Sequence, residues 1–167
     1  MSVNFFKSEC QQTINEARFG LYDAQDNSPV IIMTQNEQDW NATVINGECK
    51  SILFTAIDNC IEVLSENGDM DKRCDCMLTY DSTLLLIELK NKKSRWQEDG
   101  LEQIENIVKR MIADDAEYYY GFNKRKAVVA NKKKKAPEFQ KNNNEQRQYF
   151  NSQYKMKIQF ESEIILK

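Results

Sequence analysis

The stretch RCDCMLTYDSTLLLIELKNKK, residues 73–93, holds two apolar runs separated by a short polar segment. Residues 74–80 and 83–90 are rich in apolar and β-branched side chains, as strands usually are. The Asp81-Ser82 pair between them has the length of the tightest hairpin loops. The stretch therefore predicts an antiparallel β-hairpin at the centre of the fold.

A two-residue loop fixes which residues of this hairpin face each other. If Tyr80 faces Thr83, then Asp75 faces Glu88 on the neighbouring strand. Side chains alternate along a strand, so Lys90 shares a face with both acids. The sequence thus places two carboxylates and one ammonium group together within an apolar hairpin.

Two directly opposed carboxylates destabilise a sheet unless something compensates their charge. A divalent cation does so, since Mg²⁺ takes one or two carboxylates together with water and phosphate oxygens. With a lysine beside it, such a site could hydrolyse a phosphate ester without histidine, which this chain lacks entirely. The alternative is that Glu88 and Lys90 are solvated at a strand end, while Asp75 pairs with Arg73 or Lys72.

The elements around the hairpin follow from apolar periodicity. Residues 46–68 predict an amphipathic helix and residues 94–114 a second one, with strands at 125–131 and 155–166 around a short helix at 142–154. Upstream, residues 5–18 predict a short helix, followed by a strand hairpin at 19–24 and 29–34 and a third extended segment at 39–46. We expect one domain over 1–167, with an N-terminal extension at 1–46 and a mixed α/β core at 47–167 sharing one sheet.

The hairpin and its flanking helices resemble the PD-(D/E)xK nuclease superfamily, which has a restriction-endonuclease-like fold. Its signature is an Asp at one strand and an acid-x-Lys on the next, matched here by Asp75 and by Glu88 and Lys90. The family core is αβββαβ, which residues 47–130 would supply, with the N-terminal β extension added. Glu48 matches an acid that many members carry on the first helix, and Gln103 matches a glutamine on the helix after the lysine strand.

The resemblance implies Mg²⁺- or Mn²⁺-dependent cleavage of a phosphodiester, most often in DNA. Asp75, Glu88 and the carbonyl of Leu89 would hold the metal, and Lys90 would act on the water or the phosphate. Glu48 would bind a second ion or its water, and Gln103 would orient Lys90 or the water. Such a nuclease could serve in defence or in DNA repair, and a homodimer could cut both strands of a duplex.

The charge distribution points to a polyanionic partner. Residues 121–157 hold eleven Lys or Arg and two acids, although the whole chain has a net charge of −3. In a nuclease these cations would bind the phosphate backbone, through Lys124, Arg125, Lys126, Lys132, Lys133, Lys134 and Lys135. Alternatively, the lysine run is only a solvated loop.

The five cysteines are scattered and odd in number, which predicts free thiols. Neither a signal peptide nor an apolar run long enough to cross a membrane is visible, so we expect a cytoplasmic protein. Two other functions stay open. One is a catalytically inactive nuclease-fold module that binds nucleic acid or a protein partner, and the other is a small α+β protein whose hairpin acids are incidental.

Overall fold

The central hairpin has the predicted register. The computed structural model describes residues 2–133 and 143–167, so Lys134 and Lys135 lie outside the described residues. Strands β6 (Cys76–Tyr80) and β7 (Thr83–Lys90) are antiparallel, with Tyr80 opposite Thr83 and Cys76 opposite Ile87. Asp81 and Ser82 both have positive φ, as a tight primed hairpin turn requires.

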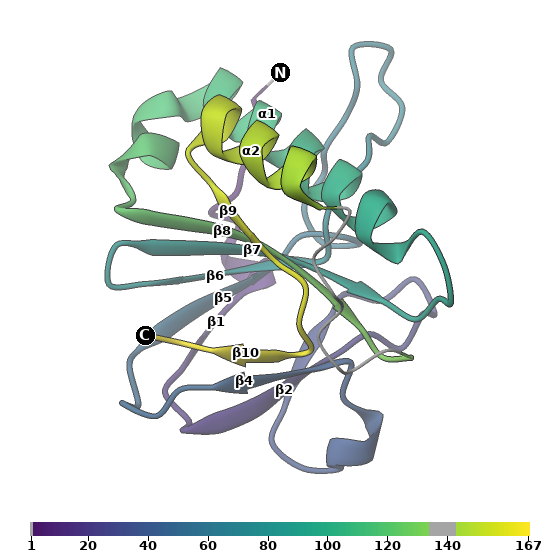
Figure 1. The fold of residues 1–167 in the computed structure, drawn as a ribbon, viewed down its shortest axis with the longest axis vertical. Coiled ribbons are helices and arrows are strands. Elements are labelled where there is room, and N and C mark those ends of the chain that lie inside the picture. The colour runs from purple at the N-terminus through teal and green to yellow at the C-terminus, as the bar shows by residue number, and fades with distance from the viewer. Residues whose placement is uncertain (1, 134–142) are drawn as a thin grey trace.

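The hairpin is the middle of a mixed sheet, which in the described chain has six strands in the order β1-β5-β6-β7-β8-β9 (Figure 1). Next to β6 runs antiparallel β5 (Ile52–Ala56), followed by β1 (Gln11–Ile14) at the edge. On the other side, β8 (Lys124–Asn131) and β9 (Lys157–Gln159) are each parallel to the strand before them. Parallel neighbours need long crossovers, here helix α1 (Trp96–Gly121) and helix α2 (Asn144–Tyr154).

A second sheet of the described residues has four strands in the order β10-β4-β2-β3. It comprises β2 (Arg18–Tyr22), β3 (Ile31–Met33), β4 (Ala42–Ile45) and β10 (Glu163–Ile165). The predicted hairpin at 19–34 and the extended segment at 39–46 are confirmed. The single strand predicted for 155–166 is instead divided, because β9 joins the first sheet and β10 the second.

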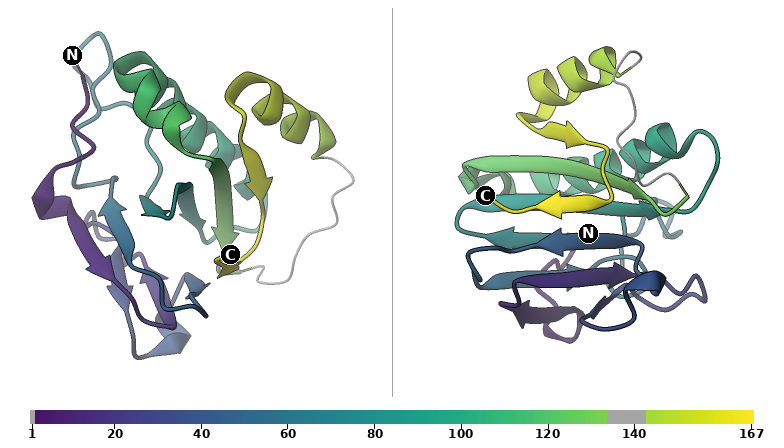
Figure 2. Two further views of the ribbon diagram at one scale, coloured as in Figure 1. Left: turned by 90° about the vertical axis from the view of Figure 1, so that its left-hand side faces the viewer. Right: turned by 60° about the horizontal axis from the view of Figure 1, so that its bottom comes forward.

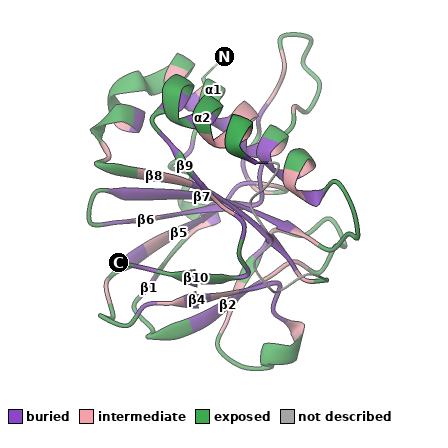
Figure 3. Cartoon of the chain, in the orientation of Figure 1, coloured by how far each residue is buried: buried purple, intermediate pink, exposed green. Residues whose placement is uncertain are grey.

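The six-stranded sheet lies between the two helices and the second sheet (Figure 2). An apolar core covers each of its faces. The core on the α1 and α2 side includes Leu84 and Leu86, and the core toward the second sheet includes Leu85, Ile87 and Leu89. Strand β7 is therefore buried on both faces along most of its length, as Figure 3 shows by colour. A polar group on β7 is accordingly shielded from water unless it lies at the strand end.

The two helices predicted before the hairpin are wrong. Residues 46–68 form β5 and a long loop, because Ile52, Phe54 and Ala56 are buried at every second position in pairing with β6. Residues 5–18 form a 3-10 turn, η1 (Ser8–Cys10), followed by β1; a second such turn, η2 (Glu37–Asp39), precedes β4. The mixed α/β class is confirmed: β5, β6, β7, α1 and β8 follow one another, and the described residues before β5 contain no α-helix.

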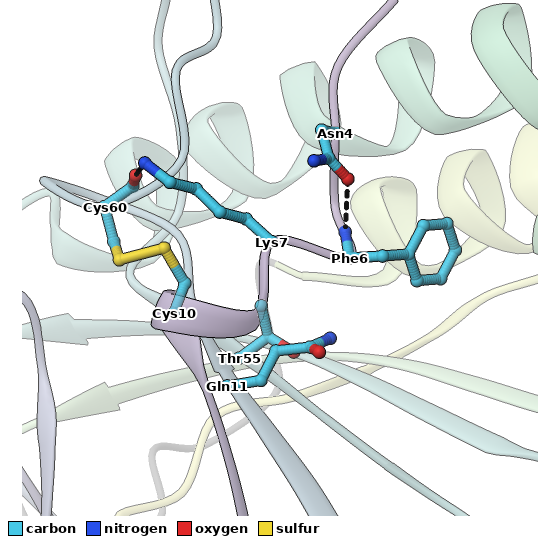
Figure 4. The surroundings of a disulfide bond; sticks show 7 residues. All are labelled: Asn4, Phe6, Lys7, Cys10, Gln11, Thr55 and Cys60. Atoms are coloured by element: carbon cyan, nitrogen blue, oxygen red, sulfur yellow. Dashed lines mark hydrogen bonds between the residues drawn. A yellow bond between two sulfur atoms is a disulfide. The ribbon is translucent and has the colours of Figure 1, made fainter.

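Two of the five cysteines are not free thiols. Cys10 and Cys60 form a disulfide with Cα atoms 5.9 Å apart, which joins η1 to the loop after β5 (Figure 4). Cys49 is free and exposed, whereas Cys74 and Cys76 are free and buried. Disulfides persist mainly in oxidising compartments, so this pairing does not favour the cytoplasmic setting that we expected. Among the described helices, none is both long and apolar enough to cross a membrane.

Candidate functional site

Asp75 and Glu88 lie together at the open end of the β6–β7 hairpin. The paired register ends with Cys76 opposite Ile87, and the backbone N–H of Asp75 also donates to the carbonyl of Ile87, at 3.1 Å. Asp75 is therefore one residue out of step with the ladder, and the predicted direct pairing of Asp75 with Glu88 does not form. The Oδ2 atom of Asp75 accepts a hydrogen bond of 2.7 Å from the N–H of Leu89. Asp75 is only 5% exposed and Glu88 only 3%. The hairpin therefore buries two carboxyl groups side by side.

Burial dominates the titration of this pair. It raises the pKa of Asp75 from 3.8 to about 7, against the opposing effect of the Leu89 N–H. Burial also raises the pKa of Glu88 well above its usual value, and the charge of Asp75 raises it further, while Lys90 lowers it. The two groups thus resist being ionised together in the protein alone.

One oxygen of Glu88 has no partner. Its Oε1 atom is buried without a hydrogen bond from any described residue, while Oε2 lies 3.1 Å from Nζ of Lys90. An unsatisfied buried acceptor costs free energy of about 1–3 kcal/mol. A proton that Glu88 shares with Asp75 would satisfy it, and so would a cation bound between them.

Lys90 is held at the site by α1. Its Nζ donates a hydrogen bond to Oε1 of Gln103, and Nε2 of Gln103 donates to the carbonyl of Arg73 at 3.1 Å. The carbonyl of Arg73 therefore determines which way the Gln103 amide faces. The Lys90 side chain is 14% exposed, so its ammonium group is fixed at the edge of the buried pair.

The alternative partners considered for Asp75 are engaged elsewhere. Arg73 forms an ion pair of 2.8 Å with Asp58, and Lys72 pairs with Glu102 on α1. Neither cation forms an ion pair with Asp75 among the described contacts. The site acids are therefore not neutralised by these residues.

Glu48 does not join the site. It lies in the turn before β5, its side chain is 76% exposed, and its nearest cation is Lys50, at 3.7 Å. Lys50 in turn pairs at 2.8 Å with Asp81, in the turn at the far end of the hairpin. At about 3.3 Å per strand residue, Asp81 is roughly 20 Å from Glu88. The first-helix role expected for Glu48 is wrong, because that helix does not form.

Sequence reasoning missed two acids near the pair. Asp23 follows β2 and Asp58 follows β5, and the negative charge of each raises the pKa of Asp75. Asp23 comes directly after β2 and Asp58 two residues after β5, and only the packing of distant strands brings them near Asp75. Asp58 in particular lies within residues 46–68, which we predicted as a helix and which instead form β5 and a loop.

The basic residues divide between the two ends of β8. Lys124 is opposite Thr83 and Asn131 is opposite Lys90, so that, of the predicted basic residues that the structure describes, Lys132 and Lys133 follow the strand at the end that carries the site. Lys124, Arg125 and Lys126 lie at the other end. They are therefore separated from Lys132 and Lys133 by the length of β8, and the phosphate-binding role expected of both groups stays a prediction.

Arg125 has a structural role at that far end. Its guanidinium donates to the carbonyls of Lys155 at 3.1 Å and Tyr119 at 3.3 Å. It also lies over the ring of Tyr119, 5.2 Å from the centroid. These contacts tie the C-terminal end of α1 to the segment before β9.

The residues that could hold a metal are few. Among the described residues, no group of three or more His, Cys, Asp or Glu side chains is arranged to bind one. Asp75 and Glu88 alone provide two hard oxygen donors, a number that suits Mg²⁺ with water and substrate as its other ligands. Leu89 contacts the pair through its N–H, and the part expected of its carbonyl stays a prediction.

Comparison of the chain with protein-family models, with curated proteins and with solved structures finds no match. The functional interpretation accordingly depends on the residues of the site.

Proposed function

We propose that this protein is a Mg²⁺- or Mn²⁺-dependent nuclease that hydrolyses phosphodiester bonds in DNA. The observation that carries the proposal is the buried pair of Asp75 and Glu88, with one Glu88 oxygen unpartnered and Lys90 beside it. Two neighbouring buried carboxyl groups can both be ionised when a cation bound between them compensates their charge. The resemblance of these residues to the PD-(D/E)xK signature supports the same proposal.

Each residue of the site then has a role in the reaction. Asp75 and Glu88 would hold the divalent cation, and the Leu89 N–H fixes the carboxylate of Asp75. The bound cation would polarise a phosphoryl oxygen and the attacking water. Lys90, held by Gln103, donates hydrogen bonds to that water or to the charge that grows on the phosphate. The attacking water would lose one proton to solvent, and the leaving sugar oxygen would take one proton from solvent, so that no histidine is needed.

The test is a titration of Mg²⁺ and Mn²⁺ on labelled DNA, with the melting temperature followed in parallel. Wild type should cut DNA only with metal, and metal should raise its melting temperature, because a ligand of the folded state stabilises it. Asp75→Asn and Glu88→Gln should remove both effects. Lys90→Met should abolish cleavage while the metal-induced shift is retained.

Glu48→Gln is the matched control, because it also removes one acid but lies at the far end of the hairpin. It should cut like wild type. If wild type does not cut and no metal shifts its melting temperature, the pair is not a working metal site. DNA binding without cleavage would then favour an inactive module on the same fold.

A further inference from the structure

Two basic loops lie side by side at the end of the sheet that carries the site. Strands β7 and β8 are parallel and end together at Lys90 and Asn131. The loop at 91–95 leaves β7, and residues 132 and 133 leave β8. Together with Lys90 they bring six cations to this edge of the sheet: Lys90, Lys92, Lys93, Arg95, Lys132 and Lys133.

Asn131 fastens the two loops together. Its side chain is 1% exposed, and its Nδ2 donates to the carbonyl of Lys92 at 2.7 Å. Its Oδ1 accepts from the N–H of Lys92 at 3.2 Å and from the N–H of Lys133 at 3.3 Å. Because both N–H groups donate to the same oxygen, the backbone nitrogens of Lys92 and Lys133 lie within about 7 Å of each other. A backbone hydrogen bond also joins the two segments: the N–H of Lys132 donates to the carbonyl of Lys90 at 2.8 Å.

Within these loops, two cations remain available for a partner. Lys92 pairs with Asp99, Arg95 lies 3.4 Å from Glu98, and Nζ of Lys132 donates to the carbonyl of Asp39 at 3.3 Å. Lys93 and Lys133 are exposed, and neither forms an ion pair with a carboxylate of the described residues. Their positive charge is therefore uncompensated by the part of the protein that the structure describes.

We propose that Lys93 and Lys133, positioned by Asn131, bind phosphates of the nucleic-acid strand that reaches Glu88 and Lys90. The identity of the polyanion rests on the proposed nuclease function, while the location of the surface rests on the geometry of the two loops. A strand whose phosphate lies at Lys90 must pass this edge of the sheet. Lys124, Arg125 and Lys126, at the other end of β8, are not part of this surface.

The test measures binding rather than cleavage. Labelled single- and double-stranded DNA is titrated in EDTA, where no metal-dependent cleavage occurs, and fluorescence anisotropy is followed over a series of salt concentrations. The double variant Lys93→Gln/Lys133→Gln should bind about tenfold more weakly at low salt. Its plot of log affinity against log salt should be shallower by about 1.8 on duplex DNA, as expected for two lost phosphate contacts.

The matched control is Lys124→Gln/Lys157→Gln, which removes the same charge from exposed positions at the far end of β8 and β9. It should bind within about twofold of wild type, since surface charges beyond a Debye length are largely screened. Equal losses in both pairs would mean that only net charge matters and would overturn the proposal. No loss in the Lys93 and Lys133 pair would overturn it as well.

A second variant tests the positioning role of Asn131. Asn131→Ala keeps every lysine, yet it should weaken DNA binding severalfold and flatten the salt dependence. Asn46→Ala is its control, because Asn46 is equally buried and makes three hydrogen bonds of the same kind, to Glu16 and Lys50. Lys50 pairs with Asp81 in the β6–β7 turn, so Asn46 lies away from the site. It should destabilise the fold comparably without changing DNA affinity. An equal loss of affinity in both variants would show a merely structural effect and contradict the positioning role.

Failure of this inference and failure of the nuclease proposal are distinguishable. If wild type binds DNA through Lys93 and Lys133 but never cuts it, only the catalytic proposal fails. If wild type cuts DNA while the double variant binds and cuts as well as wild type, only the location of the surface is wrong. If wild type neither binds nor cuts, both are overturned.

Discussion

The buried carboxyl pair makes stability depend on pH in the metal-free protein. A carboxyl group whose pKa is higher in the folded state binds its proton more tightly there, so folding is favoured at low pH. For Asp75 this stabilisation is lost as the pH rises from 3.8 toward about 7. Above that range, ionising the pair destabilises the folded state.

Asp75→Asn should therefore stabilise the metal-free protein at high pH. An amide oxygen can still accept the hydrogen bond from the Leu89 N–H, while the charge is gone. We expect a gain on the order of 2 kcal/mol in the free energy of unfolding at pH 8, and a much smaller gain at pH 5. Chemical denaturation in EDTA at the two pH values measures it. Glu48→Gln, which removes an exposed and remote acid, should show no such difference; an equal gain in both variants would contradict the role of burial.

The part of the site that the sequence predicts is the part that local geometry determines. A two-residue turn sets the register as far as Cys76 opposite Ile87 and so brings Asp75 to the end of β7, and the helix after β7 returns Gln103 to Lys90. Asp23 and Asp58 could not be found in this way. They come near Asp75 because strands far apart in the chain pack together, and no spacing in the sequence records this.

At the scale of elements, apolar residues alone did not distinguish helix from strand over 46–68. Its apolar residues recur at helical spacing, but Ile52, Phe54 and Ala56 also alternate. In the structure, residues 52–56 form strand β5 and not a helix, because they pair with β6. Helix α1, in contrast, was predicted over 94–114 and runs to Gly121, with non-helical backbone at Asp115. A long amphipathic pattern is recognisable because it spans several turns.

Gly100 sets how closely α1 packs on the sheet. A Cβ atom at this position would lie 2.5 Å from Cγ1 of Val129 on β8. Gly100→Ala should therefore push α1 away from the sheet and lower the free energy of unfolding by about 1–3 kcal/mol. The higher helix propensity of alanine offsets only part of this loss. Because Gln103 lies about one turn further along α1, the variant should also weaken the metal-induced rise in melting temperature.

Gly121→Ala is the matched control for this prediction. It lies at the C-terminal end of the same helix, and a Cβ there would have nothing within 4 Å. Its free energy of unfolding, measured by denaturant titration, should equal or slightly exceed that of wild type. If Gly100→Ala were as stable as Gly121→Ala, the close approach of α1 to β8 would not be a packing constraint.

At the scale of the whole molecule, the Cys10–Cys60 disulfide connects the N-terminal segment to the loop that carries Asp58. The bond closes a loop with a sequence separation of 50 residues, and Nζ of Lys7 donates to the carbonyl of Cys60 beside it (Figure 4). Two residues before Cys60, the N–H of Asp58 donates to the carbonyl of Asp75 at 3.3 Å. The cross-link therefore restrains a loop that contacts the candidate site.

Breaking this cross-link should lower both stability and metal response. In the chain-entropy view, a loop of this length loses about 4 kcal/mol of stabilisation when the disulfide is removed. Cys10→Ser/Cys60→Ser should melt at a lower temperature than wild type, and a dithiol reductant should lower the wild-type melting temperature equally. The rise in melting temperature on adding Mn²⁺ should shrink in both cases, because the loop beside Asp75 loses its restraint.

Cys49→Ser is the control, because it removes an exposed free thiol; it should change neither the melting temperature nor its rise with Mn²⁺. If protein purified without reductant shows five reactive thiols once it is unfolded, the disulfide does not form, and the 57–74 loop must be held by its noncovalent contacts.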